Sequence, residues 1–74
     1  MAMDIATSNA MVPENISRIA RDKGIKLTFL SSRAGLANDR TIFDILANRR
    51  LIRVNEVIAI SDALGVPVSK LFEQ

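Results

Sequence analysis

The sequence predicts a compact all-α domain of five short helices, and three observations carry that prediction. Apolar residues recur three and four positions apart, the spacing of one helical face, in each segment concerned. All three glycines fall at expected helix ends, where a residue that accepts positive φ can reverse the chain. No segment shows the alternation of apolar and polar residues typical of a strand. The expected helices lie near residues 13–23, 27–34, 38–48, 54–64 and 68–73.

Composition limits the classes of function. The 74 residues allow one domain, and three Phe with no Trp or Tyr predict an aliphatic core. The chain has no Cys and no His, which removes disulfides, thiol chemistry and the commonest metal ligands and general base. We therefore expect no cofactor and no metal. No apolar run approaches the ~18 residues of a membrane span, and no secretory signal is recognisable, so we expect a cytoplasmic protein.

The N-terminal residues lack helical periodicity. We expect residues 1–12 to form a flexible leader and residues 13–74 to form the domain. Ser8-Asn9-Ala10 resembles a tag-cleavage scar, which would make the leader partly vector-derived and Met11 the native start. Pro13 suits the first turn of a helix, where its missing N–H leaves no bond unmade, so it marks the predicted start of the first helix.

Residues 25–50 organise the rest of the chain as two short helices joined by a turn. Gly35 ends the first of these helices, Asn38 is the best N-cap for the second, and Asn48 can end it in a left-handed conformation. This pattern predicts a helix-turn-helix, whose second helix can enter the DNA major groove. The residues predicted to be buried beneath these helices and their neighbours are Ile16, Ile19, Leu30, Ala34, Ile42, Ile45, Leu46, Val57, Ile58, Leu64 and Leu71.

Positive charge gathers around the same segment. The net charge is only +2, but residues 18–53 hold nine basic residues and three acidic ones. A basic surface of this kind is expected where a protein meets phosphates, and a solvated surface is the simpler interpretation of a charge run alone. The coincidence with the predicted helix-turn-helix favours a surface for double-stranded DNA.

With these residues placed, the chain resembles the lambda-repressor-like family of helix-turn-helix proteins, of the Cro or xenobiotic-response-element type. The resemblance covers residues 15–72. Its marks are the order and spacing of Arg21-Asp22-Lys23-Gly24-Ile25, Leu30 with Ala34-Gly35-Leu36, Ile42 with Ile45-Leu46 and Asn48-Arg49-Arg50, and Ile60 with Ala63-Leu64-Gly65-Val66 and Leu71-Phe72. The turn before Ile42 is one residue longer than the usual pattern.

The resemblance implies a sequence-specific DNA-binding transcriptional regulator, repressor-like, with residues 38–48 as the recognition helix. The base-facing positions that it implies are Asn38, Asp39, Arg40, Thr41 and Asp44. The implied phosphate contacts are Lys26, Leu27 through its backbone N–H, Arg49 and Arg50, with Arg53 and Arg18 nearby. Two acidic residues on this face are unusual, because Asp accepts from cytosine N4 but otherwise opposes phosphates.

Several of these residues have a second interpretation. Arg40 either contacts a base edge or pairs with Asp39 or Asp44. Arg49 and Arg50 either anchor phosphates or complement the dipole at a helix end. Phe29 and Phe43, at positions that are normally polar in the family, are either half-buried between helices or form an apolar surface for a protein partner.

The Phe29/Phe43 surface gives the alternative function, a protein-interaction module that keeps the helix-turn-helix fold. We also expect a weak homodimer through Leu51, Ile52, Val66 and Val68, although Leu51 and Ile52 could equally be core residues. An enzyme is not expected, because Ser31, Ser32 and Thr41 have no base beside them in the sequence. Asp39 and Asp44 point about 140° apart on a helix and do not converge.

Overall fold

A computed structural model describes residues 5–73 of the chain, with side chains from Met11 onward. It contains four α-helices and one 3-10 helix: α1 (Ile5–Lys23), α2 (Leu27–Arg33), α3 (Asp39–Leu46), α4 (Val54–Leu64) and η1 (Val68–Phe72). The described residues include no strand, which confirms the all-α prediction. The fifth predicted helix is a 3-10 helix, because a five-residue segment is short for an α-helix and 3-10 geometry is common in such pieces.

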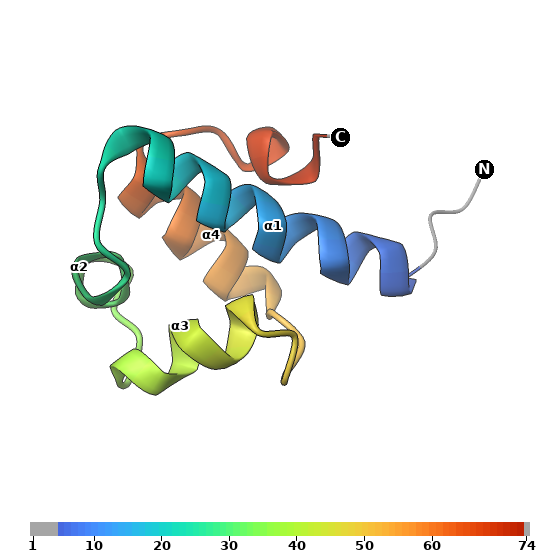
Figure 1. Ribbon diagram of the computed structural model, residues 1–74, viewed down its shortest axis with the longest axis horizontal. Coiled ribbons are helices and arrows are strands. Elements are labelled where there is room, and N and C mark those ends of the chain that lie inside the picture. The colour runs from blue at the N-terminus through green and yellow to red at the C-terminus, as the bar shows by residue number, and fades with distance from the viewer. Residues whose placement is uncertain (1–4, 74) are drawn as a thin grey trace.

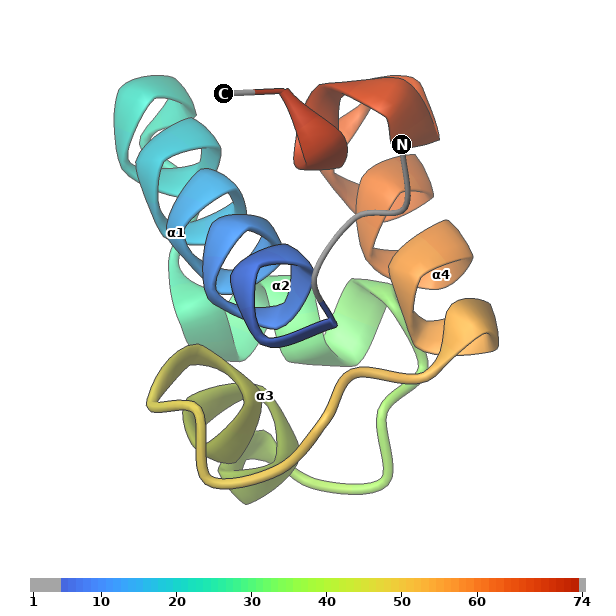
Figure 2. The same cartoon turned by 90° about the vertical axis from the view of Figure 1, so that its right-hand side faces the viewer.

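The helices surround one aliphatic core. Figure 1 shows α1 running across the molecule, with α2 at one end of it and α3 below it. Figure 2, which looks along α1, shows α3 on one side of the α1–α4 pair and the C-terminal segment on the other. The contacts agree with this view, since η1 packs on both α1 and α4 while α3 packs on α2 and α1. None of the described helices is both long and apolar enough to cross a membrane.

The predicted core is confirmed with one exception. Seven of the predicted residues are buried: Ile16, Leu30, Ile42, Ile45, Val57, Leu64 and Leu71. Ile19, Ala34 and Leu46 are partly buried and pack against them. Ile58 was predicted to be buried and is exposed, because α4 turns Val57, Ile60 and Leu64 inward and leaves Ile58 on the opposite face.

The predicted start of the first helix is wrong. Helix α1 begins at Ile5 and continues through Pro13, which lies inside the helix. A proline there removes one backbone hydrogen bond, at a cost of about 3 kcal/mol. Val12 offsets part of that cost by packing in the core against the cluster that includes Ile16. Residues 5–12 are therefore helical, and the interpretation of residues 1–12 as a partly vector-derived leader stays a prediction; residues 1–4 lie outside the described part.

Two predicted chain reversals hold α3 in place. Gly35, after α2, has φ 72° as predicted, and Asn48, after α3, has φ 59°. A side chain at φ near +60° is rare, and Asn tolerates it better than most residues. The reversal at Asn48 lets the Arg49 N–H donate to the Asp44 carbonyl at 2.9 Å. The residues on both sides of α3 are thereby fixed by backbone geometry.

Candidate nucleic-acid interface

Helix α3 has one buried face and one open face. Ile42 and Ile45 are fully buried against the rest of the domain, which fixes the helix about its axis. Asp39, Arg40 and Phe43 are exposed on the outer face. Figure 1 shows that this helix lies at the edge of the molecule. The outer face of α3 is therefore free to enter a groove.

The first turn of α3 is capped by hydrogen bonds between Asn38 and Thr41. Asn38 is the N-cap, as predicted, and its Oδ1 accepts from the Thr41 N–H at 3.2 Å and from Thr41 Oγ1 at 3.4 Å. The carbonyl of Asn38 accepts from Ser31 Oγ of α2 at 3.3 Å. Two of the five predicted base contacts, Asn38 and Thr41, therefore also serve the fold, because they cap α3 and tie it to α2.

Arg40, Asp44 and Arg49 form an ionic cluster on the outer face. Arg40 Nε lies 3.6 Å from Asp44 Oδ2. Arg49 Nη1 lies 3.4 Å from Asp44 Oδ1. The arginine side chains are 86% and 71% exposed, and that of Asp44 is 24% exposed. The alternative interpretation of Arg40, an ion pair with Asp44, is thus realised in the free protein, in an exposed geometry that leaves most of each guanidinium open.

Arg50 is used differently. Its Nη1 and Nη2 donate to the two carboxylate oxygens of Glu56, each at 2.9 Å. Glu56 Oε1 also accepts from the Arg53 N–H at 2.9 Å, at the start of α4. The Arg50 and Glu56 side chains are only 30% and 11% exposed. Arg50, predicted as a phosphate contact, is therefore a tie between the loop after α3 and the first turn of α4.

Sequence reasoning missed the role of Glu56. The signal was present, because Glu at the third position of a helix commonly reaches back to the N-cap backbone N–H. The N-cap of α4 is Arg53. The Glu56 carboxylate thus accepts from the Arg53 N–H at the start of α4, and it also accepts both hydrogen bonds from the Arg50 guanidinium.

The other predicted phosphate contacts lie on two different parts of the surface. Lys26 is the exposed N-cap of α2, and its side chain makes no capping hydrogen bond. The backbone N–H groups at the start of any helix lack an intrahelical partner, and that of Leu27 is one of them. Arg53 is exposed at the start of α4. Arg18 donates to Asn15 Oδ1 at 2.9 Å, and Asn15 Nδ2 donates to the carbonyls of Leu71 and Glu73.

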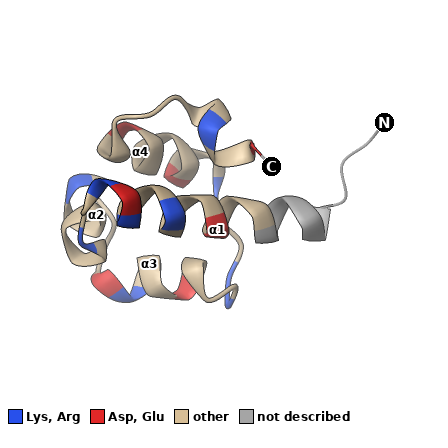
Figure 3. Ribbon diagram, turned by 45° about the horizontal axis from the view of Figure 1, so that its top comes forward, with Lys and Arg blue, Asp and Glu red and all other residues tan. Residues whose placement is uncertain are grey.

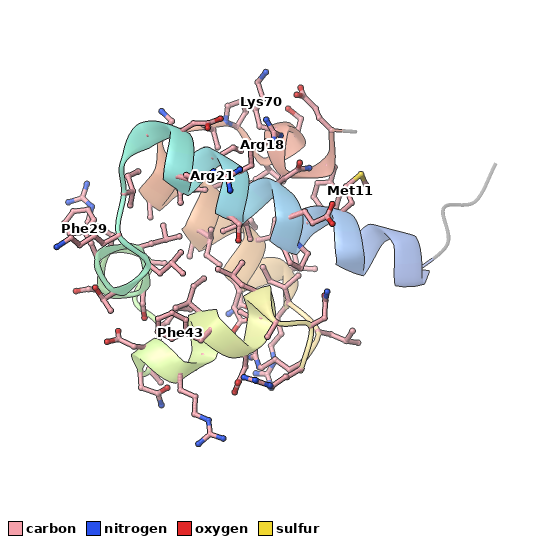
Figure 4. All side chains as sticks on the ribbon, in the orientation of Figure 1. Met11, Arg18, Arg21, Phe29, Phe43 and Lys70 are labelled. Carbon is pink, nitrogen blue, oxygen red and sulfur yellow. The ribbon has the colours of Figure 1, made fainter. Side chains whose placement is uncertain are left out.

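Arg18 therefore belongs to the contact between α1 and the C-terminal segment. Figure 4 shows Arg18 and Arg21 on α1, on the side where Lys70 lies, with α3 on the other side of the helix. Figure 3 shows acidic and basic positions close together along α3 and a basic segment in the loop after it. Arg18 is separate from that segment.

Among the described side chains, the exposed large apolar residues lie on the motif helices, on the loop after α3 and α4, and, as Phe72, on η1. Phe29 on α2 and Phe43 on α3 are both exposed, and Figure 4 shows them on the two helices of the predicted motif. Leu51, Val54 and Ile58 are exposed on the loop after α3 and on α4. The other three predicted dimer residues, Ile52, Val66 and Val68, are partly buried and pack against the core. Of the predicted dimer residues only Leu51 is therefore fully available.

Comparison with known proteins agrees with this geometry. The chain is similar to the crystal structure of the restriction-modification controller protein C.AhdI from Aeromonas hydrophila, with a TM-score of 0.82 and 15% sequence identity. The similarity covers 89% of this chain and 98% of that one. This chain has the lambda-repressor-like helix-turn-helix fold. No protein-family profile and no curated protein sequence matches it.

Proposed function

We propose that this chain is a sequence-specific DNA-binding transcriptional regulator of the repressor type, with α3 in the major groove of double-stranded DNA. The observation that carries the proposal is the two-faced packing of α3. Its inner face is fully buried by Ile42 and Ile45, while its outer face projects Arg40 into solvent at the edge of the molecule. Similarity of fold to a controller protein supports the same conclusion.

The proposed contacts divide into base and phosphate contacts. Arg40, Asp39 and Asp44 point outward from α3 and would meet base edges, with Asn38 and Thr41 at the start of the helix. Lys26, the Leu27 N–H, Arg49 and Arg53 would meet phosphates on either side. Arg50 and Arg18 have partners within the fold, and we assign them to its stability. Phosphate contacts position such a helix and base contacts provide sequence preference.

Salt dependence tests the proposal. For a duplex selected from a random pool, the logarithm of the binding constant should fall linearly with the logarithm of the salt concentration. The slope should be about −0.9 for each phosphate contact on B-DNA. Lys26, Arg49 and Arg53 then predict a slope of roughly −2 to −3 for one protomer. A selected duplex that binds no better than a random one, or a slope near zero, would rule out the proposed function.

We propose in addition that a weak homodimer forms on DNA. Recognition of two half-sites one turn apart needs the recognition helices held about 34–36 Å from each other. Because Ile52, Val66 and Val68 pack against the core, the exposed apolar residues Leu51, Val54 and Ile58 are the better surface. Sedimentation on a palindromic duplex should show two protomers, and Ile58→Asp should reduce them to one. Unchanged pairing in Ile58→Asp would remove this part of the proposal.

The exposure of Phe29 and Phe43 favours a second candidate, a protein-interaction module. The two functions separate cleanly in the salt titration. A module of this kind would bind a protein partner through those phenylalanines, lose that binding in Phe29→Ala with Phe43→Ala, and show no sequence-dependent DNA binding.

A further inference from the structure

We infer that Asp44 is a specificity-determining residue beside Arg40, because it binds Arg40 and Arg49 in the free protein and penalises DNA that offers its carboxylate no hydrogen-bond donor. This inference rests on the proposed function. It assigns the rejection of random DNA to one acidic side chain, in addition to the base contact proposed for Arg40.

The charges of Arg40 and Asp44 are not explained by helix stability, whereas that of Asp39 in the first turn is. Arg40 lies in the first turn of the helix, and Asp44 lies in its last turn. The helix dipole favours acidic residues at the start and basic residues at the end, so both charges stand at the unfavourable end. An acidic residue four positions before a basic one is also the better order for a helical pair, and here the order is reversed. The presence of the Arg40–Asp44 pair therefore needs an explanation other than the stability of α3.

The geometry brings two arginines to one carboxylate from opposite directions. Arg40 reaches Asp44 Oδ2 from the preceding turn, and Arg49 reaches Asp44 Oδ1 from beyond the end of the helix. The Arg49 N–H also donates to the Asp44 carbonyl, so the backbone itself places Arg49 beside Asp44. Asp44 thus holds two of the cations that the proposed complex needs.

The arginines can leave this cluster at little cost. Exposed ion pairs are weak, and these two have distances of 3.4 Å and 3.6 Å with arginines that are mostly in water. A phosphate or a guanine can therefore replace Asp44 as the partner of either arginine. The Asp44 carboxylate is then left facing DNA without a partner, and near phosphates this is unfavourable.

The base that faces Asp44 decides whether that penalty is relieved. The N4 amino group of cytosine is a donor in the major groove and the usual partner for a carboxylate, whereas guanine and thymine present acceptors that repel it, and adenine presents its N6 donor beside the N7 acceptor. Arg40 and Asp44 are about 6 Å apart along α3, which is close to two base-pair steps. The preferred site should therefore carry a guanine for Arg40 and, within about two base pairs, a cytosine for Asp44. Discrimination would come mainly from rejection of other sequences.

The test compares Asp44→Asn with Asp62→Asn, each measured by anisotropy on a duplex selected by the wild-type protein and on a random duplex. The control removes the same charge from an exposed position on α4, outside the proposed DNA contacts, and among the described residues Asp62 forms no ion pair. Asp62→Asn should change binding to both duplexes by a similar factor and keep their affinity ratio. Asp44→Asn should strengthen binding to the random duplex and reduce the ratio roughly fivefold to a hundredfold, the range that one base-specific contact provides.

The outcomes separate the inference from the proposed function. If the wild-type protein distinguishes the two duplexes and Asp44→Asn keeps that ratio, the inference is wrong and the proposed function stands. If Asp44→Asn weakens binding to both duplexes equally, Asp44 only positions the arginines, and the inference is again wrong. If the wild-type protein does not distinguish the duplexes, the proposed function fails and the inference fails with it.

Discussion

The outer face of α3 and the loop that follows it contain the same chemistry, arginines paired with a carboxylate, in two different environments. On α3, Asp44 meets Arg40 and Arg49 at 3.6 Å and 3.4 Å, and both arginines are largely in water. In the loop, Arg50 meets Glu56 through two hydrogen bonds of 2.9 Å, and both side chains are mostly buried. Neighbouring residues 49 and 50 therefore belong to different systems.

The difference shows that burial and geometry decide what an ion pair does. An exposed pair contributes about 0–1 kcal/mol and can exchange its partner. A bidentate pair that is shielded from water is stronger, and its two parallel hydrogen bonds fix the relative orientation of the two side chains. Loss of one partner leaves the charge of the other poorly solvated. We therefore interpret the α3 cluster as a binding surface whose arginines can exchange partners, and the Arg50–Glu56 pair as part of the scaffold that supports α3.

The largest expected effect comes from the inner face of α3, on which both systems depend. Ile42→Ala removes a fully buried side chain and should lower the free energy of unfolding by about 2–5 kcal/mol. A domain of this length is stable by only about 4–11 kcal/mol, so much of the stability should be lost. Chemical denaturation measures it. The matched control, Ile58→Ala on the exposed face of α4, should stay within about 0.5 kcal/mol, and an equal loss in both variants would contradict the assigned core.

The scaffold pair should show the next largest effect on stability. Glu56→Ala leaves the Arg50 guanidinium and the Arg53 N–H without their acceptor, so we expect a loss of about 1.5–3 kcal/mol and a Tm lower by about 4–8 °C for each kcal/mol. A double-mutant cycle with Arg50→Ala should show coupling of the two positions. Additive effects would mean that the pair does not act as a unit.

On DNA, Arg40→Ala should relax base choice. Loss of a bidentate contact to a guanine edge should cost about 1–3 kcal/mol on the selected duplex and much less on a random one. Stability should barely change, because the Arg40 side chain is 86% exposed. Equal loss on both duplexes would mean that Arg40 contacts a phosphate and that α3 is not the reading element.

The smallest expected effect is that of Asp44 on the fold. Asp44→Asn breaks two exposed pairs and removes an acidic charge from the last turn of α3, so the two contributions oppose each other. We expect a change in the free energy of unfolding within about 0.5 kcal/mol by chemical denaturation. A loss as large as that of Glu56→Ala would show that the α3 cluster is scaffold and would remove the contrast between the two regions.

The sequence predicted the motif well because its signals are local. The apolar stripe of α3, the Asn38 cap and the reversals at Gly35 and Asn48 all depend on residues a few positions apart. The start of α1 was missed because Pro13 is a normal helix start, and only tertiary packing of Val12, one turn before Ile16, shows that the helix begins earlier.

The candidate site was less predictable for a related reason. Arg49 and Arg50 are identical in type and adjacent, so their different partners depend on the path of the loop after α3. The assignment of Asn38 and Thr41 to bases came from the family resemblance, whereas the Asn38 cap, which bonds Asn38 to Thr41, was predicted from the sequence. Ile58 was misplaced because α4 is apolar on more than one side, and periodicity alone does not choose the buried one.

The most direct test of the account compares Arg49→Ala and Arg50→Ala in one salt titration on the same duplex, at a temperature where both variants are folded. Arg49→Ala should reduce the salt slope by roughly one and leave stability unchanged. Arg50→Ala should keep the slope and lower the free energy of unfolding, since its guanidinium is bound to Glu56. The opposite result, a slope that falls by one in Arg50→Ala and is unchanged in Arg49→Ala, would contradict the division between binding surface and scaffold.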